Sequence, residues 1–176
     1  ALNGAAALML TRTILVAGAR RFDLTKNANW LAQVKPAFGR GENIVVGDRM
    51  VALNLVKNPA GFQSVLRSAD ATRPTLFLVN DHYADGRDIS WLYDVDFIKF
   101  AQTPTVFAGG IRAFDIALRL EYDRVRVCEI EPDIGKVLAR FLTANSSDRL
   151  QVFATYTAML DARKVLRNYK PQRVGK

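Results

Sequence analysis

The chain of 176 residues is 49% hydrophobic and carries a formal net charge of +8. This length can bury one sizeable core but argues against a second full domain, because domains typically comprise roughly 100–150 residues. No apolar run approaches the roughly 20 residues that span a bilayer, and a single cysteine, Cys128, excludes an internal disulfide or a zinc site built on paired cysteines. Basic residues gather only over residues 163–176, as in a solvated chain end. We therefore expect a soluble protein without a signal peptide, a transmembrane segment or a nucleic-acid partner.

Hydrophobic periodicity predicts helices and strands that alternate along most of the chain. The first expected helix, over residues 1–13, begins without a capping residue, so we expect the natural chain to start further upstream. In chain order there follow a helix over 24–34, a turn at Pro36, strands over 43–46 and 50–56, a helix over 59–68, a strand over 75–79, a polar loop over 80–90, a strand over 105–108, a helix over 111–121, a strand over 125–130, a helix over 132–143, a strand over 150–154 and a helix over 157–168. This alternation predicts a Rossmann-like α/β domain, in which helices cover both faces of a mainly parallel sheet.

Polar and glycine-containing segments follow three of the expected strands. They are KNPAG at residues 57–61, NDHYADGRD at 80–88 and AGGIR at 108–112. Because ligands of such sheets bind beyond the carboxyl ends of the strands, we expect these segments along one rim. AGGIR lacks the glycine spacing of a dinucleotide-binding fingerprint.

The segment over residues 80–96, NDHYADGRDISWLYDVD, has the most unusual composition, with five aspartates and three aromatic residues. Gly86 permits a positive φ, which would let Asp85 and Asp88 project in different directions. One aspartate here could orient a histidine, accept a hydrogen bond from an amine, or hold a cation. Equally, both could cap a turn or the short helix expected near Ser90. The spacing is not that of a calcium loop, so we expect no metal site.

Three other positions have a functional and a structural interpretation. Lys57 and Asn58 lie where a strand turns into a helix, so they could hold an anion at free helix amides or simply close the strand and cap the helix. Cys128 lies inside an alternating strand pattern, away from any turn, so we expect it to be inert. The chain therefore cannot supply a complete cysteine glutaminase site.

Four segments together resemble the C-terminal domain of the MurT family of Mur-ligase-like proteins. They are LVKNPAGF at residues 55–62, NDHYADGRDISWLYDVDF at 80–97, GGIRAFDIALRL at 109–120 and FATYTAML at 153–160. The string DGRD-x-SW is the most specific part of a resemblance that covers nearly all of residues 39–165. It implies a Mur ligase type C-terminal α/β domain over residues 37–176. The opening ALNGAAA is similar to the last helix of a Mur ligase central domain, which implies a helical tail and linker over residues 1–36.

The resemblance implies a place in an enzyme complex. The full subunit would use ATP and Mg to activate the α-carboxylate of D-glutamate in lipid II, and a GatD glutaminase would release ammonia from glutamine. Asp88 matches the aspartate that completes a catalytic triad with the cysteine and histidine of GatD. A cytoplasmic location follows, with lipid II as an optional link to the inner membrane surface.

The resemblance also assigns roles to other residues. Arg40, Lys57 and Asn58 match positions that face the nucleotide or substrate cleft, and Asp85, Trp91 and Tyr93 are expected at the partner interface. The chain lacks the phosphate loop and the cysteine-rich zinc insertion of the whole subunit. Alone, it is expected to bind no cofactor tightly and to have no activity.

Two alternatives remain open at the level of sequence. In the C-terminal domain of another Mur-type peptide ligase, the same loop would bind the incoming amino acid, and Arg87 would pair with a substrate carboxylate. A free-standing Rossmann-like binding module would need only the fold and would explain none of the motifs.

Overall fold

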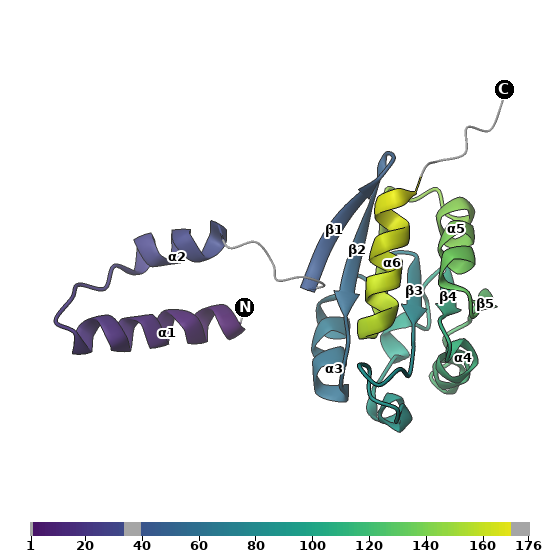
Figure 1. Cartoon of the computed structure of the whole chain (residues 1–176), viewed down its shortest axis with the longest axis horizontal. Coiled ribbons are helices and arrows are strands. Elements are labelled where there is room, and N and C mark those ends of the chain that lie inside the picture. Colours follow the sequence, from purple (N-terminus) through teal and green to yellow (C-terminus); the bar gives the residue numbers. More distant parts are fainter. Residues whose placement is uncertain (1, 34–39, 170–176) are drawn as a thin grey trace. The chain divides into compact units, whose positions relative to one another are not determined.

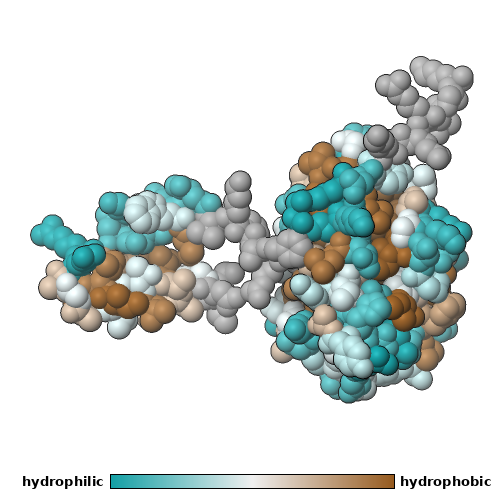
Figure 2. Space-filling view, in the orientation of Figure 1, coloured by the Kyte–Doolittle hydropathy of each residue, from teal (hydrophilic) through white to brown (hydrophobic). Residues whose placement is uncertain are grey.

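The computed structural model describes residues 2–33 and 40–169, and the chain divides into two compact units, residues 1–37 and 38–176 (Figure 1). The first unit holds helices α1 (Leu2–Ala17) and α2 (Leu24–Gln33), which contact each other. Hydrophobic side chains remain exposed on both helices, among them Met9, Leu10, Ile14 and Trp30. Figure 2 shows hydrophobic residues gathered over α1. The expected turn at Pro36 lies outside the described residues.

The second unit is built on a six-stranded sheet with strand order β1-β2-β6-β3-β4-β5. The strands are β1 (Arg40–Val46), β2 (Arg49–Leu55), β3 (Thr75–Leu78), β4 (Val106–Gly109), β5 (Glu129–Glu131) and β6 (Arg149–Ala154). β1 runs antiparallel to β2, and every other neighbouring pair is parallel. The predicted mainly parallel α/β sheet is therefore confirmed.

Helices cover both faces of this sheet, which gives the unit two hydrophobic layers. α5 (Ile134–Ala144) and α6 (Tyr156–Asn168) pack on one face. α3 (Pro59–Ser68), α4 (Ala113–Tyr122) and the 3-10 helices η1 (Ser90–Asp94) and η2 (Ile98–Phe100) pack on the other. On that second face, five phenylalanine rings form a chain of contacts with centroids 5.3–6.2 Å apart: Phe62, Phe77, Phe97, Phe100 and Phe153. The edge-to-face and stacked contacts among them add to the stabilisation that comes from burying the rings.

The sequence predicted the limits of one helix correctly and those of one strand incorrectly. α3 begins as predicted, because the Asn58 side chain accepts a 2.8 Å hydrogen bond from the Gly61 amide and Pro59 fills the first helical position. The strand predicted over residues 125–130 is wrong in length, since only Glu129–Glu131 pair with β4. The turn that ends α4 reaches as far as Val125, with Arg124 at φ 59° and the Val125 amide bonded to the Leu120 carbonyl.

The chain leaves β6 and β3 toward opposite faces of the sheet. After β6 it enters α6 on one face, and after β3 it runs through residues 79–89 to η1 on the other. These two strands are neighbours. Their carboxyl ends therefore form a topological switch point, where α/β proteins characteristically bind ligands.

Candidate functional site

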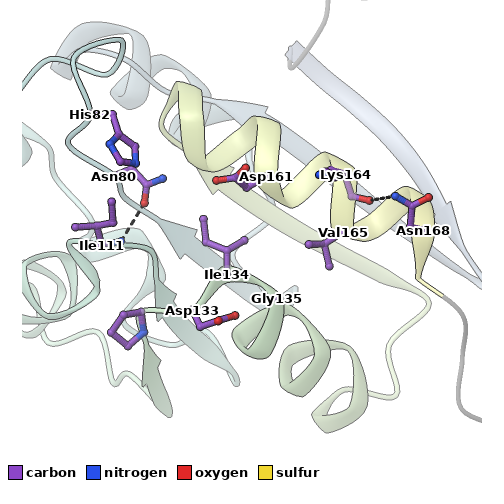
Figure 3. A pocket seen from close by; sticks show the side chains of 11 residues that line it. Asn80, His82, Ile111, Asp133, Ile134, Gly135, Asp161, Lys164, Val165 and Asn168 are labelled. Carbon is purple, nitrogen blue, oxygen red and sulfur yellow. Dashed lines mark hydrogen bonds between the residues drawn. The ribbon is translucent and has the colours of Figure 1, made fainter.

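A hollow of about 560 Å³ lies at the carboxyl ends of β3, β4 and β5, between the start of α5 and the side of α6 (Figure 3). Apolar side chains in its lining include Ile111, Ile134 and Val165. Polar groups from separate elements also line it, among them His82, Asp133, Asp161, Lys164 and Asn168. Of the three segments expected along one rim, 80–88 and 108–112 line this hollow, whereas 57–61 does not.

Asn80, at one end of this hollow, joins three elements. It is 2% exposed, and its Oδ1 accepts a 3.0 Å hydrogen bond from the Ile111 amide (Figure 3). Its Nδ2 donates to Thr157 Oγ1 at 3.0 Å, and its backbone amide donates to Thr155 Oγ1 at 2.9 Å. The end of β3 is thereby fixed to the turn before α4 and to the start of α6.

Asp85 points inward, toward the first turn of α6. It is 7% exposed, and its Oδ1 accepts a 2.8 Å hydrogen bond from the Thr157 amide. Its Oδ2 accepts from Thr157 Oγ1 at 2.5 Å and from the His82 amide at 3.2 Å. The carboxylate that the sequence places at the partner interface is therefore engaged inside the chain.

Asp88 has the opposite surroundings, although it follows Asp85 by only three residues. Gly86 adopts the predicted positive φ, at 89°, and Asp88 is exposed. Its Oδ1 accepts a 2.8 Å hydrogen bond from the Ser90 amide at the start of η1. Hydrogen bonding from Ser90, first through its backbone amide, lowers the pKa of Asp88 below its ordinary value. An accessible, ionised carboxylate is thus held at the surface near neutral pH.

The expected interface and substrate residues near Asp88 differ in exposure. Arg87 is exposed and lies over the ring of Tyr83, with 5.4 Å from its guanidinium carbon to the ring centroid. Trp91 is half-buried and contacts Phe62 edge-on at 6.3 Å, so part of the indole belongs to the core. Tyr93 is 55% exposed and contacts Tyr122 on α4 at 6.1 Å. Of the two aromatic residues, Tyr93 therefore offers more surface to a partner.

The remaining predicted residues lie at the start of β1 and at the turn into α3. Lys57 is exposed there, whereas Asn58 uses its side chain to cap α3. Arg40 begins β1, and its side chain lies outside the described residues.

Sequence reasoning overlooked Asn80, Thr155 and Thr157 as parts of the site. The available signal was two threonines directly after the buried strand β6, opposite an asparagine directly after β3. The pairing between them spans more than 70 residues and depends on β6 lying beside β3. No local spacing rule indicates such a contact.

Cys128 is exposed in the segment before β5, away from the rim. Across residues 2–33 and 40–169, no group of three or more His, Cys, Asp or Glu side chains is arranged to hold a metal ion. In the same ranges, no helix is long and apolar enough to cross a membrane.

The fold is similar to the folds of Mur-type and folylpolyglutamate synthase ligases. A pseudomurein peptide ligase type C from Methanothermus fervidus aligns with a TM-score of 0.59 and 14% identity, over 95% of this chain and 34% of that one. Mycobacterium tuberculosis folylpolyglutamate synthase, solved with ADP and AMPPCP, aligns with a TM-score of 0.52 and 18% identity, over 88% and 37%. These likenesses define a Mur ligase type C-terminal α/β fold.

Sequence comparison narrows this class to one family. Residues 55–159 match the family described as MurT ligase C-terminal. The MurT subunit of lipid II isoglutaminyl synthase (glutamine-hydrolyzing) from Streptococcus pneumoniae is 34% identical over 140 residues. That match covers 75% of this chain and 31% of the pneumococcal protein, so the chain spans about a third of its relative's length. The chain belongs to the MurT ligase C-terminal family, which confirms the resemblance noted in its sequence.

Proposed function

We propose that this chain is the C-terminal domain of the ATP-dependent subunit of a lipid II isoglutaminyl synthase. In this role it docks a GatD-type glutaminase and donates Asp88 to that partner's Cys–His site. The complex would amidate the α-carboxylate of D-glutamate in lipid II, in the cytoplasm and at the inner membrane surface where lipid II lies. Family membership supports the proposal, as does the name of the pneumococcal relative, which includes glutamine hydrolysis.

The contrast between two carboxylates carries the assignment of Asp88. Asp85 is buried and accepts hydrogen bonds from Thr157 and the His82 amide, so it is committed within the fold. Asp88 is exposed, and its lowered pKa keeps it charged, so it can accept a hydrogen bond from an incoming imidazole. Tyr93 lies five residues further on and offers an aromatic anchor for a partner.

An aspartate in this position acts on cysteine chemistry through a histidine. The carboxylate accepts the Nδ1–H bond of the imidazole, which leaves Nε2 free to take the proton of the cysteine thiol. The thiolate then attacks the side-chain amide carbon of glutamine, and ammonia leaves with a proton returned by the imidazole. The chain provides the carboxylate, and the partner provides the other two groups.

Nucleotide binding would rest mainly on parts of the subunit beyond this chain. Lys57 is exposed beside the first turn of α3, which suits contact with a phosphate. Asn58 is less suited to that role, because its side-chain oxygen already caps the helix. Bound ATP would supply the phosphoryl group that activates the substrate carboxylate, and Lys57 would help to hold its phosphates.

We also propose that residues 1–36 are the helical tail of the subunit's central domain and its linker. The exposed apolar side chains of α1 support this assignment, because an isolated helix pair gains little from leaving them in water.

The test uses the full-length subunit co-expressed with its glutaminase. We expect Asp88→Asn to lower the rate of glutamine hydrolysis by about 100-fold or more, because an asparagine favours the wrong imidazole tautomer. Binding of the two subunits should persist, since Asp88 is one exposed residue of a larger surface. The pH profile of hydrolysis should also change, because the carboxylate no longer supports the imidazolium.

Asp94→Asn is the matched control, because Asp94 is an exposed aspartate in η1, six residues further along. It should leave hydrolysis within about twofold of the unaltered complex. Equal activities for both variants would remove Asp88 from the mechanism. The amino-acid-binding alternative, with Arg87 on a substrate carboxylate, would then explain the loop better.

A further inference from the structure

The first turn of α6 lacks an acidic residue of its own and takes one from a distant loop. Thr155 is the capping residue of this helix but makes no side-chain capping bond to it. Asp85 instead accepts from the Thr157 amide, which is one of the free N–H groups at the helix start. A carboxylate there is also favoured by the positive end of the helix dipole.

The Thr157 hydroxyl connects this contact to the end of β3. It accepts from Asn80 Nδ2 at 3.0 Å, so its single proton is available for Asp85 Oδ2 at 2.5 Å. Asp85 Oδ2 also receives the His82 amide, and the Asp85 amide donates back to the His82 carbonyl at 2.9 Å. The loop is thus closed on itself and fastened to α6 by one buried carboxylate.

Asp88 emerges from this fastened segment after a single glycine turn. Gly86 at φ 89° reverses the chain, and the Ser90 amide then holds the Asp88 carboxylate. Only Gly86 and Arg87 separate the fastened residue from the exposed one. A shift at Asp85 is therefore passed on to Asp88 over a very short path, and a misplacement of about 1 Å can reduce a catalytic rate by up to about 100-fold.

We propose that Asp85 and Thr157 are positioning residues that hold the Asp88 carboxylate where the partner's histidine can use it. The inference rests on the proposed function of Asp88. The sequence suggested that Asp85 contacts the partner. We instead assign it a role within the chain, because its carboxylate faces α6.

The test begins with two Thr157 variants in the co-expressed full-length complex. Thr157→Val removes the hydroxyl and keeps the side-chain shape and the helix amide, and we expect kcat for glutamine hydrolysis to fall about tenfold. The KM for glutamine and the Kd of the two subunits should stay within about twofold, because neither binding surface changes. Thr157→Ser retains the hydroxyl and should restore kcat.

A double variant separates positioning from general damage. If Thr157 acts through Asp88, adding Thr157→Val to Asp88→Asn should cause no further loss of activity. Losses that multiply in the double variant, or a Thr157→Val enzyme with unchanged kcat, would overturn the inference.

Amide hydrogen exchange in the same complex gives a reading that does not depend on activity. Thr157→Val should speed exchange at the Asp85 and Thr157 amides by about tenfold, because their bonds to α6 and the loop are weakened. If Asp88→Asn leaves hydrolysis unchanged, the proposed function fails. Amide exchange then tests only whether the contact between Asp85 and Thr157 orders the loop. Unchanged exchange would refute it, while faster exchange would retain Asp85 and Thr157 as the residues that order this loop.

Discussion

Neighbouring aspartates of this chain owe their different states to what surrounds each carboxylate. Asp85 is satisfied by donors of α6 and the loop, and Asp88 by the Ser90 amide at the surface. Asp123 shows a third arrangement. Its carboxylate accepts from the Phe97 amide at 2.6 Å and pairs with the buried Arg119 at 3.0 Å.

Asp123 gives a pH-dependent prediction at this scale. Burial alone would raise its pKa, but hydrogen bonds from Arg119 and Phe97 and the charge of Arg119 lower the pKa overall. A lowered folded-state pKa contributes stability above the unfolded value, near 4, and that stability is lost as the pH falls through the folded value. We expect Asp123→Asn to reduce the free energy of unfolding by about 2 kcal/mol at pH 7.

Urea denaturation at pH 7, 5 and 3 measures this effect. The difference between Asp123→Asn and the unaltered chain should be the same at pH 7 and 5 and should shrink at pH 3. Asp115→Asn is the control, because Asp115 pairs with Arg112 at a half-exposed position and should change stability by less than about 1 kcal/mol. A difference that grows toward pH 3 would contradict the assignment of a lowered pKa.

Residue-scale prediction from sequence succeeded where the signal was local. Gly86 was expected to allow a positive φ, and it has one. Asn58 was open to a structural or an anion-binding interpretation, and the structure shows the capping contact. The hydrogen bonds from Thr157 to Asp85 could not be foreseen, because they join segments 72 residues apart.

At the scale of elements, the turns that link strands to helices define the rim. Gly110, at φ 89°, connects β4 to α4 so closely that an added Cβ would lie 2.5 Å from the Val79 carbonyl oxygen and 2.8 Å from Asn80 Oδ1. Gly86 has the same φ, yet no atom lies within 4 Å of an added Cβ. An alanine at Gly86 would therefore test backbone strain alone, and an alanine at Gly110 would test backbone strain together with steric overlap.

We expect Gly86→Ala to reduce the free energy of unfolding by about 1–2 kcal/mol, through the strain of a positive φ alone. Gly110→Ala should reduce it by about 2 kcal/mol more, because the methyl group also displaces the buried Asn80 or the end of β3. Denaturant titration of the two variants side by side measures the difference. Equal losses would show that the structure around Gly110 accommodates the methyl group at no cost beyond the positive-φ strain.

Sheet pairing explains which element boundaries the sequence could not set. The helix over residues 59–68 was predicted with its observed limits, because its cap and its proline are adjacent in sequence. β5 was predicted twice as long as it is, because the Val125 amide is bonded to the Leu120 carbonyl in the turn after α4 and only Glu129–Glu131 pair with β4. The order of β6 between β2 and β3 likewise follows from packing on two faces.

At the scale of the whole molecule, the buried core belongs to the second unit alone. Both hydrophobic clusters consist of residues between 44 and 169, and none comes from α1 or α2. Removal of residues 1–37 should therefore change the melting temperature of the α/β unit by less than about 2 °C. Calorimetry of the 38–176 fragment beside the complete chain checks this. A drop of more than about 8 °C would show that the first unit stabilises the second and would count against its assignment to another domain.

The proposed role of Asp88 depends on one contact between two proteins, and a structure of the full-length subunit bound to its glutaminase measures that contact directly. We predict that an Asp88 carboxylate oxygen lies about 2.6–3.2 Å from Nδ1 of a glutaminase histidine, with Nε2 of that ring facing the cysteine thiol. Asp85 should still contact Thr157 in that complex. A histidine paired with a carboxylate of the glutaminase itself, with Asp88 remote from the ring, would contradict the proposed role of Asp88.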